Sequence, residues 1–190
     1  HLGQRLKRVG RLNSREATRL MIGVASALSC AHDLGLVHRD IKPSNIMIDH
    51  RGMVKVVDFG LAKITSGADV TRTGRFMGTP RFVSPEQARG EPVDIRSDIY
   101  ALGVVLYQAM SGRHPFEAEH DFAVIHKSVT EKAECPTTIV RDMPPFLASI
   151  IMKMMEKNPE ERYQTPKLLL ADLKRFRSEA ARTTGYRMIT

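Results

Sequence analysis

Apolar residues recur at helical spacing in the first part of the chain. Asn13 and Glu16 form a capping-box pattern, which predicts a helix that begins there and ends near Gly35. Two short β-forming runs follow, Ile46–Ile48 and Met53–Val57, on either side of a polar turn. The pattern therefore predicts a long helix that leads into a small β-hairpin.

The rest of the chain is divided by one long stretch without periodicity. From Leu61 to Gly90 the sequence is rich in Gly, Thr, Ser and Arg, and a loop of this length in a compact domain is usually functional or disordered. Residues 178–190 are expected to form a frayed tail. Helical patterns occupy the remaining segments: Ser97 to Met110, Glu119 to Val129, Leu147 to Met154, and Thr165 to Phe176. The expected fold class is mainly α, a helical bundle with a small β-hairpin and one long loop.

Composition and charge narrow the function classes. The 190 residues are 42% hydrophobic and 26% charged, which is typical of a globular protein. The net charge of +8 is concentrated at the two ends: residues 1–20 hold six basic residues and one acidic residue, and residues 167–190 hold six and two. Aromatic residues make up only 6% and Trp is absent, so we expect no nucleic-acid partner.

Cysteine and histidine positions indicate no metal site. Cys30 and Cys135 lie far apart, which favours reduced thiols and a cytoplasmic location. No apolar run approaches the roughly 18 residues of a membrane span. His114, His120 and His126 recur every six residues, a spacing that fits neither a helix face nor a metal site, so we expect all three on the surface.

The chemically informative cluster is His-Arg-Asp-Ile-Lys-Pro-Ser-Asn, from His38 to Asn45. Asp58-Phe59-Gly60 follows thirteen residues after Asn45, and Ser84-Pro85-Glu86 closes the long loop. In this order and spacing, the chain resembles the protein kinases, and the resemblance extends over almost the whole sequence.

This resemblance implies roles for particular residues in phosphoryl transfer, which requires alignment and charge neutralisation. Asp40 would orient the substrate hydroxyl and accept its proton, and Lys42 would hold a cation near the transferred phosphate. Asn45 and Asp58 would bind Mg²⁺, or Mn²⁺ in its place, together with ATP. Met47 would form the floor of the adenine pocket. The cofactors implied are therefore ATP and Mg²⁺.

The resemblance also indicates substrate class and regulation. Lys42, together with Thr79 in a Gly-Thr-Pro sequence, is typical of Ser/Thr kinases, in which Thr79 would bond to the catalytic Asp and Lys and position the substrate. The stretch from Gly78 to Glu91 is most similar to the eukaryotic-like Ser/Thr kinases of bacteria. Thr71 and Thr73 lie where that group places its autophosphorylation sites. Arg39 would pair with the resulting phosphothreonine and order the loop.

Other matched residues have supporting roles by the same resemblance. Glu86 and Arg162 would form a buried ion pair, and Asp98 would accept amides from the catalytic loop. His38 would stack on Phe59 rather than act as a base. The full supporting set is His38, Arg39, Phe59, Gly60, Glu86, Asp98 and Arg162.

Parts of the kinase pattern are not in the sequence. It contains no Gly-x-Gly-x-x-Gly loop and no Val-Ala-Ile-Lys-type strand. We therefore expect residues 1–177 to be the large C-terminal lobe, residues 178–190 a basic tail or linker, and the small lobe to precede residue 1. A large lobe alone would bind ATP weakly and catalyse little. The alternative is a truncated, non-catalytic docking or decoy module, but the complete catalytic set favours the enzyme.

The expected partners follow from this interpretation. They are protein substrates, the N-terminal kinase lobe and, in kinases of this group, a second copy of the kinase. The sequence shows no membrane segment, although kinases of this group often continue into one.

Overall fold

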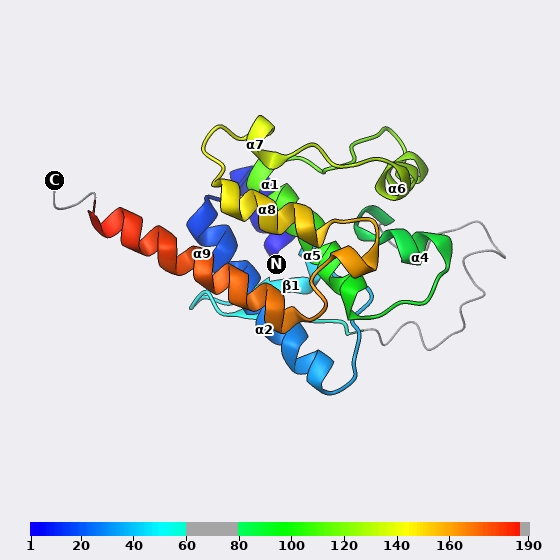
Figure 1. Cartoon of the computed structure of the whole chain (residues 1–190), viewed down its shortest axis with the longest axis horizontal. Helices are drawn as coiled ribbons and strands as arrows, with labels where there is room; N and C mark the ends of the chain where they lie inside the picture. Colours follow the sequence, from blue (N-terminus) through cyan, green and yellow to red (C-terminus); the bar gives the residue numbers. More distant parts are fainter. Residues whose placement is uncertain (60–79, 187–190) are drawn as a thin grey trace.

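The computed structural model describes residues 1–59 and 80–186, and the structural statements below concern those residues. They form a mainly helical fold with a single antiparallel pair of strands (Figure 1). The α-helices are α1 (Leu2–Val9), α2 (Ser14–Asp33), α4 (Pro85–Arg89), α5 (Ile95–Ser111), α6 (Asp121–Thr130), α7 (Pro136–Ile139), α8 (Pro145–Met154) and α9 (Pro166–Tyr186). The short elements are the 3₁₀ turns η1 (Pro43–Asn45), η2 (Pro80–Phe82) and η3 (Pro159–Glu161), and the strands β1 (Ile46–Ile48) and β2 (Val54–Val56).

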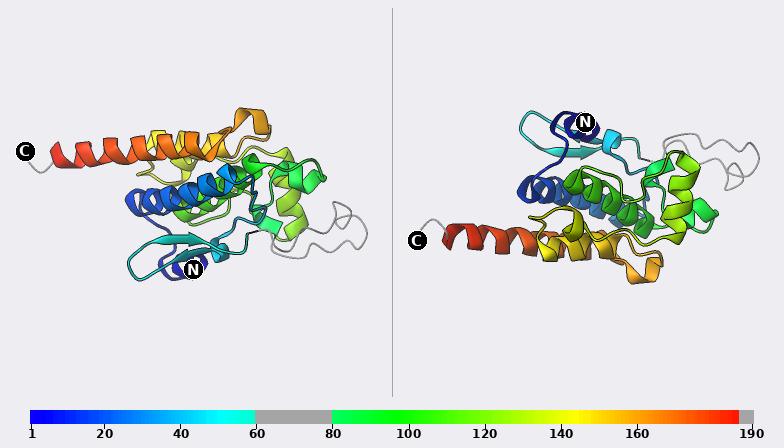
Figure 2. Two further views of the ribbon diagram at one scale, coloured as in Figure 1. Left: turned by 90° about the horizontal axis from the view of Figure 1, so that it is seen from below. Right: turned by 90° about the horizontal axis from the view of Figure 1, so that it is seen from above.

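The elements lie in three layers. Helices α2 and α5 form the middle layer, with α8 and α9 on one side and α1 and the β-hairpin on the other (Figure 2). The hairpin packs closely on α2, because Gly23 has no side chain where Val54 approaches: a Cβ on Gly23 would lie 2.7 Å from Val54 Cβ. The α2 helix thereby provides a fixed base for the hairpin.

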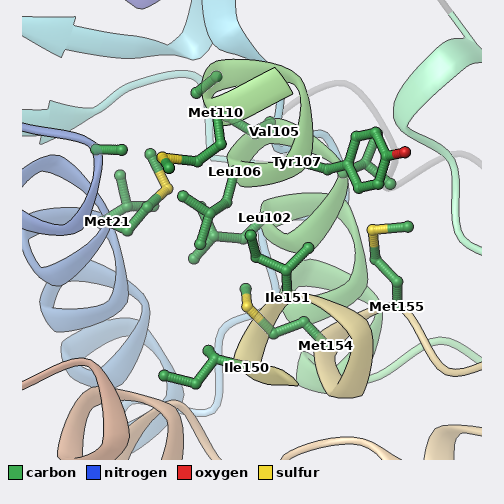
Figure 3. Close-up of a cluster of buried hydrophobic side chains, with 14 of the residues drawn as sticks. Met21, Leu102, Val105, Leu106, Tyr107, Met110, Ile150, Ile151, Met154 and Met155 are labelled. Carbon is green, nitrogen blue, oxygen red and sulfur yellow. The ribbon is translucent and has the colours of Figure 1, made fainter. Parts of the chain in front are cut away.

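Helix α5 is the centre of the core. Almost all of its residues are buried, and its apolar side chains meet those of α2 and α8 (Figure 3). Helices α5 and α8 approach closely at Gly103, where a Cβ would lie 2.8 Å from Met154 Cβ. Met154 and Met155 are buried in this cluster and belong to the core.

The last helix runs antiparallel to α2. Lys167, at the start of α9, pairs with Asp33, at the end of α2, with 2.8 Å between Nζ and Oδ1. Leu169, Leu173 and Phe176 bury the inner face of α9. The C-terminal half of α9 therefore runs back towards the start of α2 (Figure 2).

The structure confirms several element predictions. Asn13 caps α2 through a bond from the Glu16 amide, and Thr165 Oγ1 accepts from the Leu168 amide at the start of α9. Helix α5 ends at Gly112, which adopts the left-handed conformation with φ of 79°. The hairpin pairs Ile46 with Val56.

Other element predictions are wrong. Helix α9 does not stop near Phe176 but continues to Tyr186, because the run from Glu179 to Arg182 consists of good helix formers and Arg175 pairs with Glu179 one turn on. Helix α4 lies inside the segment predicted to be irregular, where Ser84 and Gln87 form a capping box. Helices α1 and α7 were not predicted, since each is short and has few buried positions.

No helix in the described ranges is both long enough and apolar enough to cross a membrane.

Candidate active site

The segment from His38 to Asn45 is held by a buried carboxylate at the start of α5. Asp98 is 1% exposed and accepts the backbone amides of His38 and Arg39, at 2.7 Å to Oδ2 and 2.8 Å to Oδ1. Burial raises the pKa of Asp98 to about 6, although the two amides oppose this by favouring the carboxylate. The α5 helix thus fixes the backbone immediately before Asp40, as predicted for Asp98.

His38 connects this loop to the end of the hairpin. Its Nδ1 accepts the Asp40 amide at 3.2 Å, so the ring proton lies on Nε2, which donates to the Val57 carbonyl at 2.9 Å. The ring is fully buried and its centroid lies 4.6 Å from that of Phe59, so the two rings are in contact as expected, but their planes are tilted by 57° and are not stacked in parallel. Because both ring nitrogens are engaged in backbone bonds, His38 is not placed to act as a base.

The Asp40 carboxylate is exposed and bonded on one oxygen. Its side chain is 51% exposed, and Oδ2 accepts from Lys42 Nζ at 2.7 Å and from Asn45 Nδ2 at 3.3 Å. Asn45 Nδ2 also donates to the Asp40 carbonyl at 3.0 Å, which fixes the loop around the carboxylate. Among the residues that the structure describes, both side-chain bonds go to Oδ2, which leaves Oδ1 able to accept a bond from an incoming hydroxyl.

The hairpin brings Asn45 and Asp58 together. Since Ile46 pairs with Val56, Asn45 lies opposite Val57, whose amide donates to the Asn45 carbonyl at 3.0 Å. Asp58 follows directly, is exposed, and has a left-handed backbone with φ of 60°. Two residues that are thirteen apart in the sequence are therefore neighbours at the open end of the hairpin.

Helix α4 borders the same loop. Gln87 Nε2 donates to the Arg39 carbonyl at 3.0 Å, and Glu86 forms the predicted ion pair with Arg162, at 2.7 Å between Nη1 and Oε1. Sequence reasoning missed Gln87, although its place three residues after Ser84 is a capping-box signal. The loop around Asp40 is therefore supported by α5, by the hairpin and by α4.

Comparison with known proteins gives the family of the chain. The model of the family described as "Protein kinase domain" matches residues 1–172. This chain belongs to the protein kinase family. Members of the family transfer phosphate with ATP and Mg²⁺.

The similar proteins are bacterial Ser/Thr kinases. A Corynebacterium glutamicum protein named "Probable serine/threonine-protein kinase PknB" is 44% identical over 171 residues, which cover 87% of this chain and 26% of that protein. PknB of Mycolicibacterium smegmatis is 42% identical over 166 residues, covering 86% of this chain and 27% of the relative. PknA of Mycobacterium tuberculosis (H37Ra) is 44% identical over 160 residues, covering 84% and 36%. The chain thus spans about a quarter to a third of the length of these relatives.

The donor set fits the magnesium ion that the kinase family uses. The Asn45 amide nitrogen is committed to Asp40, so its Oδ1, which accepts a bond from Ser44 Oγ at 3.2 Å, is the atom that can face a cation. With the exposed Asp58 carboxylate this gives two hard oxygen ligands of the kind Mg²⁺ prefers. In the described ranges, no group of three or more His, Cys, Asp or Glu residues could hold a metal. Because Mg²⁺ usually keeps several waters and takes substrate phosphates as ligands, these would complete its shell.

Of the remaining predicted site residues, some are exposed and others lie outside the described part of the chain. Met47 lies on β1 with 40% of its surface exposed, and Arg39 is exposed with no ion pair among the described residues. Gly60, Thr71, Thr73 and Thr79 lie outside the described residues. The prediction for His114 is wrong: this side chain is only 5% exposed, whereas His120 and His126 are on the surface.

Proposed function

We propose that this chain is the C-terminal catalytic lobe, residues 1–177, of a Ser/Thr protein kinase, followed by a basic linker at residues 178–190. The observation that carries the proposal is the Asp40 carboxylate, exposed on a loop that buried groups hold rigid, beside Lys42 and the Asn45–Asp58 pair. The relatives named as Ser/Thr kinases support the substrate class. A cytoplasmic location, where ATP is available, is part of the proposal, as are protein substrates and a kinase homodimer.

In the proposed reaction the substrate hydroxyl attacks the γ-phosphorus of ATP. The new oxygen–phosphorus bond forms as the bond to the bridging oxygen of ADP breaks, and Asp40 Oδ1 accepts the hydroxyl proton. Lys42, paired with Oδ2, keeps positive charge beside the transferred group. Asn45 and Asp58 would hold Mg²⁺, which neutralises phosphate charge when bound. Met47 would lie under the adenine, while the Gly-rich loop and its partner Lys would come from the N-terminal lobe.

The loop that contains Thr71 and Thr73 is proposed to regulate the enzyme. Arg39 is the cation beside Asp40 that a phosphothreonine could bind through two hydrogen bonds. Mass spectrometry of the active full-length protein is expected to find phosphate on Thr71, Thr73 or both. An active enzyme with neither residue modified would exclude this regulation.

The proposed activity is tested by phosphate transfer from γ-labelled ATP to a generic protein substrate, with the full-length protein that contains this chain. We expect Asp40→Asn to lower kcat about 10²- to 10⁴-fold, because general base catalysis contributes that much. Asp142→Asn, at an exposed aspartate in the turn before α8, is the matched control and should retain activity. Activity undiminished in Asp40→Asn would contradict the role of Asp40, and no transfer by the wild type would favour a docking module.

A further inference from the structure

His114 is a buried histidine that the proposed reaction does not use. It lies in the loop after α5, and each of its ring nitrogens bonds to the backbone. Nδ1 accepts the Phe116 amide at 3.1 Å, and because an amide can only donate, the ring proton of neutral His114 lies on Nε2. Nε2 then donates to the carbonyl of Arg81 in η2, at 2.7 Å. His114 therefore links the α5–α6 loop to the segment that enters α4.

The bonding of His114 repeats that of His38. In His38, Nδ1 accepts the amide two residues on, that of Asp40, and Nε2 donates to the distant carbonyl of Val57. His38 thereby fixes the catalytic loop to the residue before Asp58. By the same arrangement, His114 fixes Arg81.

Arg81 belongs to a segment that adjoins the catalytic loop. Five residues after η2, Gln87 donates to the Arg39 carbonyl, next to Asp40. A second tether, from Arg81 Nε to Asp121 Oδ1 at 3.1 Å, is exposed on both sides and is therefore weak. The segment from Pro80 to Gln87 thus adjoins the residue before Asp40 at its Gln87 end, and His114 is its buried anchor at the Arg81 end.

We propose that His114 is a positioning residue for the protein substrate: in its neutral form it holds the Arg81 backbone in the position that binds the substrate polypeptide beside Asp40. This inference rests on the proposed function. It assigns to His114 an effect on the affinity for protein substrate and none on ATP or on the chemical step.

The bond from the Phe116 amide to His114 requires a neutral ring, so we expect it to weaken as the pH falls. Protonation would place a second N–H on Nδ1, directly against the Phe116 amide, and would remove that bond. Burial lowers the pKa of His114. Three charged side chains surround the ring: Arg81, Glu117 and Lys157. The Glu117 Oε1 atom accepts a bond from the His114 amide, and Lys157 lies over the Phe116 ring. Because the folded form favours the neutral ring, the stability that His114 contributes is complete above its ordinary pKa of 6.5 and is lost as the pH falls below it.

Two substitutions of His114 test its two ring bonds separately, because each can keep one bond and removes the other. In His114→Asn, Oδ1 can take the place of Nδ1 and accept the Phe116 amide, but no donor reaches Arg81. In His114→Gln, Nε2 can still donate to the Arg81 carbonyl, and no group titrates. The Asn variant is therefore the test of the link, and the Gln variant is its matched control.

The experiment measures steady-state kinetics of the full-length protein with a generic protein substrate, from pH 5.5 to about 8. We expect His114→Asn to raise KM for the protein substrate about 2- to 10-fold, the value of one neutral hydrogen bond, with KM for ATP and kcat unchanged. His114→Gln should restore the wild-type KM at neutral pH. We expect KM of the wild type for the protein substrate to rise at acid pH, where His114 is protonated, and we expect His114→Gln to remove this rise.

Hydrogen exchange of the Arg81 and Phe82 amides gives a readout that does not depend on catalysis. We expect faster exchange in His114→Asn than in His114→Gln or the wild type. Absence of phosphate transfer by the wild type would refute the proposed function and with it the substrate role, while the exchange data would still test the link. The proposal would be overturned if exchange and KM for the protein substrate were equal in the wild type and both variants. It would also be overturned if both variants changed KM for ATP and thermal stability in the same way.

Discussion

The buried ion pair between Glu86 and Arg162 allows a quantitative prediction about stability. Both side chains are almost fully buried, at 3% and 2% exposed, and they form two parallel bonds of 2.7 Å. Ser97 Oγ also donates to Glu86 Oε1, at 2.5 Å. The remaining donors of Arg162 bond to backbone carbonyls of Glu156, Arg96 and Lys157, at 2.7, 3.0 and 3.1 Å respectively. Every hydrogen-bonding atom of the two buried side chains therefore has a partner.

The size of the effect follows from the pKa of Glu86. Burial opposes its ionisation, but the bonds from Arg162 and Ser97 outweigh this and lower the pKa from 4.5 to about 2. A shift of this size corresponds to about 3 kcal/mol of folding free energy. Since the folded pKa is the lower one, this contribution is complete above pH 4.5 and is lost as the pH falls from there towards 2. Removal of Arg162 leaves a buried carboxylate unpaired, which typically costs about 3–5 kcal/mol.

The assay is urea unfolding of the chain, followed by circular dichroism, at pH 7 and at intervals down to pH 3. Arg162→Met should lower the free energy of unfolding by about 3–5 kcal/mol at pH 7. Glu86→Gln should remove the share of the pH dependence below pH 4.5 that is due to Glu86, about 3 kcal/mol, and leave the share of the other carboxylates. Arg175→Met, at the exposed pair with Glu179, is the matched control and should cause no measurable change. The reasoning is refuted if Arg162→Met costs no more than the control, or if Glu86→Gln keeps the acid dependence of the wild type.

Two further substitutions test the supports of the site. Asp98→Ala leaves the amides of His38 and Arg39 without acceptors, so we expect the free energy of unfolding to fall by about 2–6 kcal/mol. In the full-length protein we also expect kcat to fall, and an unchanged kcat would show that Asp98 is not needed to place the loop. Gly103→Ala would place a methyl group 2.8 Å from Met154 Cβ and should destabilise the chain by about 1–3 kcal/mol in urea unfolding; a neutral result would mean that α5 and α8 can separate without cost.

The fold could be predicted from sequence where the signals are local. Asn13, Gly112 and Thr165 mark helix ends through bonds within their own turns, so their identity alone reveals them. Helix α1 escaped prediction because only Leu2 and Leu6 are buried, and one pair of apolar positions does not establish a period. The end of α9 is later than the apolar pattern predicts because Phe176, the last buried apolar residue among the side chains that the structure describes, lies ten residues before the end of the helix.

In the candidate active site, too, the contacts that could be predicted from sequence are the local ones. Asp40, Lys42 and Asn45 lie within one short loop, so their contact follows from their order in the chain. Glu86 and Arg162 are 76 residues apart, and only the resemblance to kinases paired them. The spacing of His114 from the other histidines excludes a metal site but carries no information on burial, so the expectation of a surface position for His114 was wrong. Its partner, the Arg81 carbonyl, is a backbone group, which no side-chain pattern can reveal.

Backbone strain shows what the supports of the loop achieve. Among the described residues, only Arg39 and Asp58 have a positive φ without being glycine, at 67° and 60°. A left-handed conformation at an arginine is costly and persists only where its surroundings impose it. At Arg39 the amide is held by Asp98 and the carbonyl by Gln87, so both sides of the residue are fixed.

The strain at Asp58 is held in a similar way from the preceding residue. The Val57 carbonyl accepts from His38 and the Val57 amide donates to Asn45, so the peptide that leads into Asp58 has no freedom to relax. These strained residues stand immediately before the proposed base and at the proposed metal ligand. We infer that the buried carboxylate of Asp98 and the buried ring of His38 offset the cost of two unfavourable backbone conformations, and that they thereby fix the backbone next to Asp40 and at Asp58.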